Sequence, residues 1–329
     1  MSAAFEDALA RSVQNWCAGA TGIRDAAQLS GGASQETWAF TIVRPDGDID
    51  AILRRAPPGY GAAPSRAAGL DAEAELMRLS YDAGVPSPRV LHVLTEADQC
   101  GTGFIMQRVE GETIPRKILR DAQFATARPM LARQLGGILA GIHGIESAAL
   151  PALRTMSSTE EIAQLDAEYR SFGWPRPVFE LALRWLSRHD PGVSKKITLV
   201  HGDFRHGNLI IGPDGVRAVL DWELAHLGDP MEDLGWVCVN SWRFGEIDKP
   251  VGGLGSREEM FAGYEAGGGN VDADRVKFWE VMGTLRWGIM CCGMMQRFRQ
   301  GPDHSMERAM IGRRSSETEI DLLRILAPL

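Results

Sequence analysis

The sequence lacks most features that mark a secreted or nucleic-acid-binding protein. It has only five cysteines in 329 residues, and none of them forms a CxxC pair. The adjacent Cys291 and Cys292 are poorly placed for a disulfide framework, so we expect reduced cysteines and a cytoplasmic protein. A net charge of −8 and the absence of a long basic run argue against nucleic acid as the main partner.

The sequence also lacks an uninterrupted apolar run. Residues 1–16 are acidic and amphipathic, unlike a signal peptide. The most apolar stretch, 276–295, contains Lys277, Glu280 and Arg286, and such charges are costly inside a lipid bilayer. We therefore predict a core helix there and no membrane partner. The length is sufficient for two lobes with a sizeable core.

One stretch, residues 198–235, holds three polar residues at a spacing suited to a single site. A predicted strand delivers Asp203 onto a loop, and a predicted hairpin with a Gly-Pro-Asp-Gly turn brings Asn208 close to Asp221. An acceptor-only carboxylate beside an Asn/Asp pair suits a hydroxyl nucleophile flanked by Mg²⁺, which prefers hard oxygen ligands. The strands of this stretch are expected at 198–200, 209–211 and 216–220.

The sequence of this stretch resembles that of a known family. Four residues separate Asp203 from Asn208, as in the kinase catalytic loop, and a metal-binding Asp at a hairpin end follows. HGD, DWE and GDPMEDLGW are similar to the aminoglycoside phosphotransferase (APH) family of small-molecule kinases. LRRAPPG and HGDFRHGN look like the APH-like domains joined to acyl-CoA dehydrogenases.

The resemblance implies an α+β, protein-kinase-like fold with two lobes. Residues 1–106 are expected to form a small nucleotide-binding lobe with a five-stranded antiparallel sheet. Residues 107–329 are expected to form a larger, mostly helical lobe with the catalytic and substrate-binding groups. The resemblance implies that Asp203 orients and deprotonates an acceptor hydroxyl, and that Asn208 and Asp221 hold Mg²⁺ against the phosphates of ATP.

A Gly-rich turn precedes the predicted strand 36–43. Small residues let backbone N–H groups approach phosphates closely, and in kinase-like folds such a loop covers ATP. The resemblance places Gly31, Gly32 and Ser34 in this role. It also places the adenine beside backbone groups of Gln107 and Val109, at the hinge between the lobes.

The strand 49–55 departs from the kinase pattern, because its end carries Arg54 and Arg55 where a Lys is usual. Side chains alternate across a strand, so the two arginines point to opposite faces. Alignment of AILR with the family's strand favours Arg54 as the phosphate-binding residue, and Arg55 stays an alternative. Glu73 on the next helix matches the acid that pairs with this cation, and Glu75 is its alternative.

Apolar periodicity and capping patterns predict the remaining elements. Asp71, Asp229 with Glu232, and Ser316 with Glu319 are expected to cap helices. Strands are also expected at 90–94 and 104–109, and helices at 4–18, 71–83, 128–143, 158–170, 178–188, 257–266, 272–299 and 317–326.

Several rival interpretations stay open at this point. The loss of the usual Lys is compatible with a catalytically silent nucleotide-binding protein of the same fold. His201, Asp203 and His206 allow a zinc site, although their neighbours fit Mg²⁺ better. A dehydrogenase is disfavoured because no βαβ unit follows the glycines. The acceptor is expected to be a small molecule, either a hydroxyacyl thioester or an aminoglycoside-like compound, because little chain separates Asp221 from Asp229 for the activation loop of a protein kinase.

Overall fold

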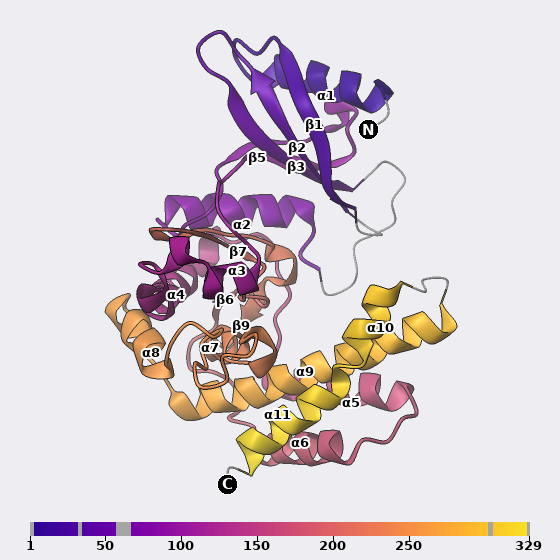
Figure 1. Ribbon diagram of the computed structural model, residues 1–329, viewed down its shortest axis with the longest axis vertical. Helices are drawn as coiled ribbons and strands as arrows, with labels where there is room; N and C mark the ends of the chain where they lie inside the picture. Colours follow the sequence, from indigo (N-terminus) through magenta and orange to yellow (C-terminus); the bar gives the residue numbers. More distant parts are fainter. Residues whose placement is uncertain (1–2, 32–34, 57–66, 302–304, 328–329) are drawn as a thin grey trace.

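The computed structural model describes residues 3–31, 35–56, 67–301 and 305–327. A sheet and two helices form one lobe, and most of the helices form the second, larger lobe below it (Figure 1). The sheet has five antiparallel strands in the order β1-β2-β3-β5-β4. The predicted α+β architecture with a small five-stranded lobe is therefore confirmed.

The four strands that the sequence placed in the small lobe are present in the predicted order. The remaining strand, β1, was not predicted, and it includes Gly31 of the expected Gly-rich turn; its pairing with β2 is irregular. The elements of this part of the chain are α1 (Ala3–Trp16), β1 (Gly22–Gly31), β2 (Glu36–Val43), β3 (Ile49–Ala56), α2 (Leu70–Asp82), β4 (Val90–Val93) and β5 (Thr102–Gln107).

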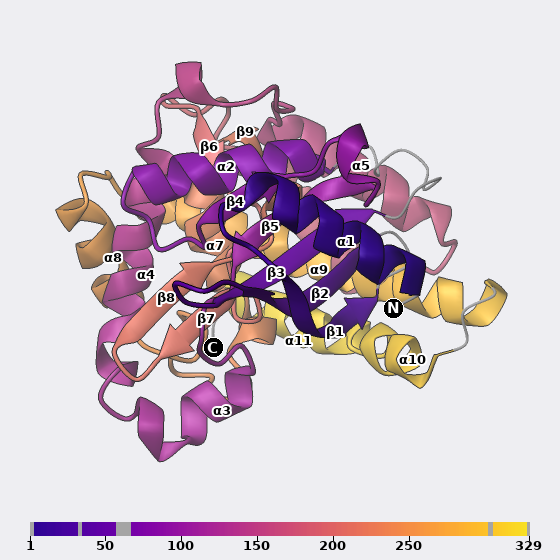
Figure 2. The same cartoon turned by 90° about the horizontal axis from the view of Figure 1, so that it is seen from above.

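The two faces of the sheet bury different helices, because side chains alternate along each strand. On one face, Leu9 and Val13 of α1 pack into a cluster with Ile105. On the other face, the neighbouring Phe104 joins the large core together with Met77 of α2. Figure 2 shows α1 lying across the strands and α2 along the β4 side of the sheet. Consecutive residues of β3 and β5 therefore face separate environments.

The large lobe is built on long helices around a small β-structure. The longest helix, α9, packs on α7, α10 and α11. The helices and strands of the large lobe are α3 (Pro115–Arg120), α4 (Arg128–His143), α5 (Ser158–Ser171), α6 (Pro177–Arg188), β6 (Thr198–Val200), β7 (Leu209–Gly212), β8 (Gly215–Val219), β9 (His226–Gly228), α7 (Met231–Val237), α8 (Arg257–Ala266), α9 (Ala273–Gln300), α10 (Met306–Gly312) and α11 (Ser315–Leu326).

The apolar stretch 276–295 lies within α9, as predicted. Glu280 is buried there because Arg243 and Arg257 pair with its two carboxylate oxygens at 2.9 and 2.6 Å. A buried carboxylate is tolerated when it is paired and hydrogen-bonded. In the described part of the chain, no helix is long and apolar enough to cross a membrane.

The predicted helix caps fail in three places, each for a tertiary or backbone reason. Helix α2 begins after Gly69, whose φ is 86°, and Asp71 lies within it. Before α7, Asp229 accepts a hydrogen bond from the N–H of Met231, but Glu232 turns away to pair with His226 and Arg286. Helix α11 begins without a side-chain cap, and its Glu319 pairs with Arg176 of another helix.

Candidate active site

The loop after β6 is held from below by one buried carboxylate. Asp233 of α7 accepts hydrogen bonds from the N–H groups of His201 and Gly202, at 2.8 and 2.9 Å. His143 of α4 contacts the same carboxylate at 3.1 Å. Burial favours the neutral acid, yet His143 and His201 hold the pKa of Asp233 below its usual value. The buried His143 thus braces the loop.

Asp203 stands on this loop and receives several hydrogen-bond donors. Arg205 Nε and Trp236 Nε1 both donate to its Oδ1, each at 2.9 Å. Asn208 Nδ2 donates to its Oδ2 at 2.7 Å and to its backbone carbonyl at 2.9 Å. The carboxylate is oriented from two sides, and the Asn208 amide is turned so that its Oδ1 points away from Asp203. Sequence reasoning missed Arg205 and Trp236.

The hairpin of β7 and β8 brings Asn208 and Asp221 together, as predicted. The N–H of Leu220 donates to the carbonyl of Asn208 at 2.8 Å, which closes the open end of the hairpin. Asp221 follows with a φ of 66°, a left-handed conformation that Asp adopts more readily than most residues. Asn208 and Asp221 line the same cavity between the lobes.

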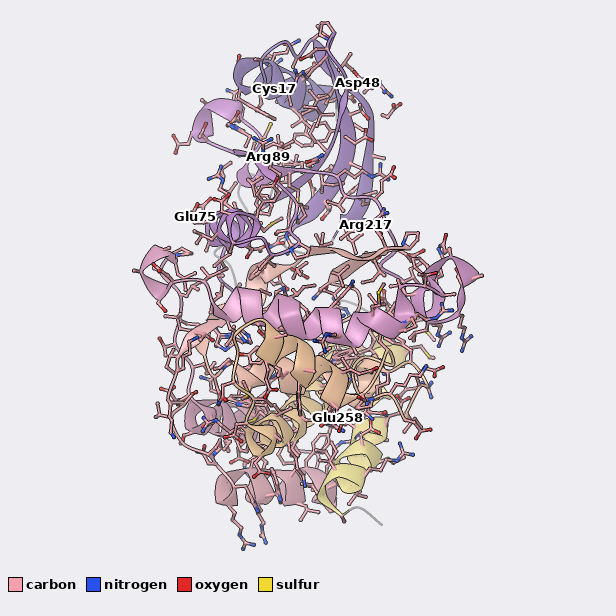
Figure 3. All side chains as sticks on the ribbon, turned by 90° about the vertical axis from the view of Figure 1, so that its left-hand side faces the viewer. Cys17, Asp48, Glu75, Arg89, Arg217 and Glu258 are labelled. Atoms are coloured by element: carbon pink, nitrogen blue, oxygen red, sulfur yellow. The ribbon has the colours of Figure 1, made fainter. Side chains whose placement is uncertain are left out.

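Arg54 reaches Asp221 from the sheet above. Its Nη2 lies 2.7 Å from Asp221 Oδ1, and its Nε lies 3.2 Å from Glu73 Oε2 on α2. A third acid, Glu223, lies 3.6 Å from Nη2. Burial raises the pKa of Glu73 to about 8, against the opposing effect of the Arg54 guanidinium. The helix acid that meets Arg54 is therefore Glu73. Figure 3 labels Glu75 on the outer side of α2, where it pairs with Arg78.

Arg55 points to the opposite face of the sheet. Its Nε and Nη2 donate to Glu36 at 3.0 and 2.8 Å, and its Nη1 donates to the carbonyl of Cys100 at 3.0 Å. Its guanidinium also lies 3.4 Å from the ring centroid of Phe5 on α1. Arg55 is thus tied into the small lobe, and Arg54 is the arginine beside Asp221.

A cavity of about 300 Å³ lies between the sheet and the hairpin. Its lining includes Gln107 and Val109 of the predicted hinge, and also Arg54 and Glu73. The N–H of Gln107 is already used, because it donates to the carbonyl of Arg89 at 2.8 Å. Among the described residues, the N–H of Val109 has no hydrogen-bond partner, so it is available to a ligand.

The predicted phosphate-covering loop is only partly visible. Gly31 ends β1, where it pairs with Glu36. Gly32 and Ser34 lie outside the described residues. Leu29 and Thr37, on the two strands that flank the loop, line the cavity, and the sequence had not singled them out.

A model of the phosphotransferase enzyme family matches residues 25–270 of the chain. The chain belongs to this family. A curated relative, mouse acyl-CoA dehydrogenase family member 10, is 27% identical over 313 residues, which is 89% of the chain but only 28% of that protein. The resemblance to domains associated with acyl-CoA dehydrogenases, expected from LRRAPPG and HGDFRHGN, is confirmed.

Solved structures share the phosphotransferase fold. A candidate aminoglycoside phosphotransferase from Ralstonia eutropha superposes with a TM-score of 0.75 at 20% identity, and the match covers 97% of both chains. The aminoglycoside phosphotransferase APH(4)-Ia, in a ternary complex with AMP-PNP and hygromycin B, gives a TM-score of 0.61 at 16% identity, covering 98% of this chain and 99% of that one. These likenesses show the two-lobe fold.

The donor atoms that line this cavity fit Mg²⁺ better than zinc. The described residues contain no group of at least three His, Cys, Asp or Glu side chains placed to hold a metal. His201 uses both ring nitrogens, one toward the N–H of Asp203 and one toward the Leu220 carbonyl. His206 is buried and bonds to the carbonyl of Gly252 at 2.7 Å, so the zinc alternative fails. Asn208 and Asp221 instead offer hard oxygen atoms to the shared cavity.

Proposed function

We propose that this protein transfers the γ-phosphoryl group of ATP to a hydroxyl group of a small molecule, with Mg²⁺. The observation that carries the proposal is the convergence of separate elements on one cavity. Arg54 comes from β3 and Asp221 from the end of the hairpin, and they meet at 2.7 Å. Asn208 joins Asp221 in the cavity lining and contacts Asp203 at 2.7 Å. Phosphoryl transfer depends mainly on such positioning and charge neutralisation.

The nucleotide is placed in the cavity between the lobes. Apolar side chains of Ile52, Met106 and Ile210 form part of its lining and suit a flat base. The free N–H of Val109 provides a backbone donor for adenine. Arg54 binds the phosphates with a planar, permanently charged guanidinium. Gly31, Gly32 and Ser34 stay proposed as the loop that covers them.

The chemical step is assigned to Asp203. Its carboxylate orients the acceptor hydroxyl and accepts the proton as the oxygen attacks the γ-phosphorus. Asn208 Oδ1 and the Asp221 carboxylate would hold Mg²⁺. When bound, that ion neutralises charge on the phosphates. Arg54 must exchange its contact with Asp221 for the phosphates, because one oxygen of that carboxylate is otherwise occupied.

A small-molecule acceptor fits the chain that follows the site. Between Asp221 and α7 the chain forms only a short 3-10 helix, Trp222–Leu224, and the strand β9. That segment leaves little room for the long activation loop of a protein kinase.

The charge of a second cavity bears on the acceptor class. This cavity has a volume of about 580 Å³ and lies among α3, α10, α11 and the segment around Trp242. The ring of Trp242 contacts Arg205. Its lining has four arginines and three acids, of which Glu317 and Asp321 are paired with Arg314 and Arg324. This charge favours an acceptor with an anionic group, such as a hydroxyacyl thioester, over a polycationic aminoglycoside.

The test is Mg²⁺-dependent ATP consumption against a panel of hydroxyacyl-CoA thioesters, choline-like alcohols, macrolides and aminoglycosides. We expect turnover with one class and its loss in Asp203→Asn, which preserves side-chain size. Asp214→Asn is the matched control, because Asp214 is exposed and pairs with Arg217 of the same hairpin. Tight MgATP binding without turnover on any acceptor would favour the silent nucleotide-binding alternative. Equal turnover by the Asp203→Asn protein would refute the assignment of Asp203.

A further inference from the structure

Arg205 lies beside the carboxylate of Asp203, which other side chains also orient. Its Nε donates to Asp203 Oδ1 at 2.9 Å, and Trp236 Nε1 donates to the same oxygen at the same distance. Asn208 fixes the other oxygen at 2.7 Å. A neutral side chain therefore already shares the task of positioning Asp203. Positioning of Asp203 does not require the permanent positive charge of Arg205, so that charge is available for another role.

The loop holds the Arg205 guanidinium in one place. Its Nη1 donates to the carbonyl of His206 at 2.8 Å, and its plane lies over the Trp242 ring, 4.7 Å from the centroid. Gly207 has a φ of 94°, and a Cβ there would approach Nη1 to 3.0 Å, so glycine makes room for this arrangement. A cation fixed over an aromatic face loses little entropy when it binds a ligand.

One end of this guanidinium is left for a ligand. Within the described part of the chain, Nη2 of Arg205 donates to no group, and the side chain is 28% exposed. Another arginine of the same aromatic cluster is paired with acids. Arg286 stands over Trp236 and lies 3.4 and 2.7 Å from Glu161 and Glu232. Arg205 thus combines an accessible donor with a fixed position next to Asp203.

We propose that Arg205 is a further catalytic residue, whose free N–H groups bind the oxygens of the phosphoryl group while it passes from ATP to the acceptor. The inference rests on the proposed function. In that step the bond from the acceptor oxygen to the γ-phosphorus forms, and the bond from the γ-phosphorus to the bridging oxygen of ADP breaks. The hydroxyl proton goes to Asp203. Arg205 exchanges no proton, and its charge stabilises the oxygens of the group in transit.

A transition-state analogue tests this role without knowledge of the acceptor. The affinity of the protein for MgADP with tetrafluoroaluminate is compared with its affinity for MgADP alone. For Arg205→Gln we expect a loss of about 100-fold for the tetrafluoroaluminate complex, the order found when one donor to a transition-state charge is removed. The affinity for MgADP should change by less than about threefold, and Arg205→Lys should recover part of the loss because it restores a charge.

Two comparison variants separate this role from positioning. Trp236→Phe removes the other donor to Asp203 Oδ1 but no charge, so it should not reproduce the selective loss of the analogue. Arg217→Gln is the control for the loss of an arginine elsewhere, because Arg217 lies on the hairpin and pairs with Asp214. Equal losses for MgADP and for its tetrafluoroaluminate complex in Arg205→Gln, or equal losses in Trp236→Phe, would overturn the proposal. A wild-type protein that binds neither complex would instead refute the proposed function.

Discussion

The two adjacent arginines of β3 provide a matched pair of substitutions. Arg54→Gln and Arg55→Gln change the same side chain at neighbouring positions, on opposite faces of the sheet. Arg54 faces Asp221 and the cavity, at 2.7 Å from that carboxylate. Arg55 faces α1 and donates to Glu36 and to the Cys100 carbonyl. We expect the first change to weaken nucleotide binding and the second to weaken the fold.

The size of each effect follows from the contacts. A hydrogen bond to a charged group contributes about 1.5–3 kcal/mol. Loss of the phosphate contact in Arg54→Gln should therefore raise the Kd for MgATP about 10- to 100-fold. The fold tolerates this change, because burial already raises the pKa of Glu73, and loss of the Arg54 guanidinium, which opposes that rise, lets Glu73 take up a proton more readily. Arg55→Gln breaks the contacts with Glu36 and should lower the free energy of unfolding by about 1–3 kcal/mol, with MgATP affinity within about threefold of wild type.

The assays are calorimetric titration with MgATP and urea denaturation followed by tryptophan fluorescence. Arg54→Lys is the conservative control, and it should bind MgATP within about tenfold of wild type because it keeps the charge. The reasoning is refuted if Arg55→Gln weakens MgATP more than Arg54→Gln does. It is equally refuted if Arg54→Gln leaves the Kd unchanged.

Further predictions concern the metal, pH and thiols. Asp221→Asn keeps a residue that tolerates the φ of 66°, so the fold should persist while the Mg²⁺ concentration needed for nucleotide binding rises about tenfold or more; an unchanged Mg²⁺ titration would contradict this. Although burial opposes it, His226 and Arg286 hold the pKa of Glu232 at about 2, below the ordinary 4.5. That depressed pKa gives about 3 kcal/mol of stability above pH 4.5 that is lost as pH falls toward 2, so urea denaturation of Glu232→Gln should show a shallower acid slope than wild type. All five cysteines are buried and free, and burial raises the pKa of Cys100 to about 11 and of Cys291 to about 12. A thiol reagent at pH 8 should therefore label the native protein slowly and the urea-unfolded protein fully; fast native labelling would contradict the buried placement.

Local sequence patterns predicted much of the site because its parts are close in the chain. The spacing of Asp203 and Asn208 places both on one loop, and the Gly-Pro-Asp-Gly turn returns the chain so that Asp221 arrives beside them. Strand alternation also predicted that Arg54 and Arg55 face opposite ways. The long helix α4 and the helix around 276–295 followed from apolar periodicity, which reports burial directly.

The sequence by itself thus determined the motif loop and the hairpin, since these depend on turn residues and short spacings, and the two-lobe class followed from the resemblance of this motif to the phosphotransferase family. Only the tertiary structure decided which arginine meets Asp221, because that choice depends on α1 packing against the face that holds Arg55. It also paired Glu232 with His226 and Arg286 instead of leaving it as a local cap, since a carboxylate that the packing buries must be paired and hydrogen-bonded. Likewise, the contact between Trp236 and Asp203 joins residues far apart in sequence, and such contacts depend on how α7 docks under the loop.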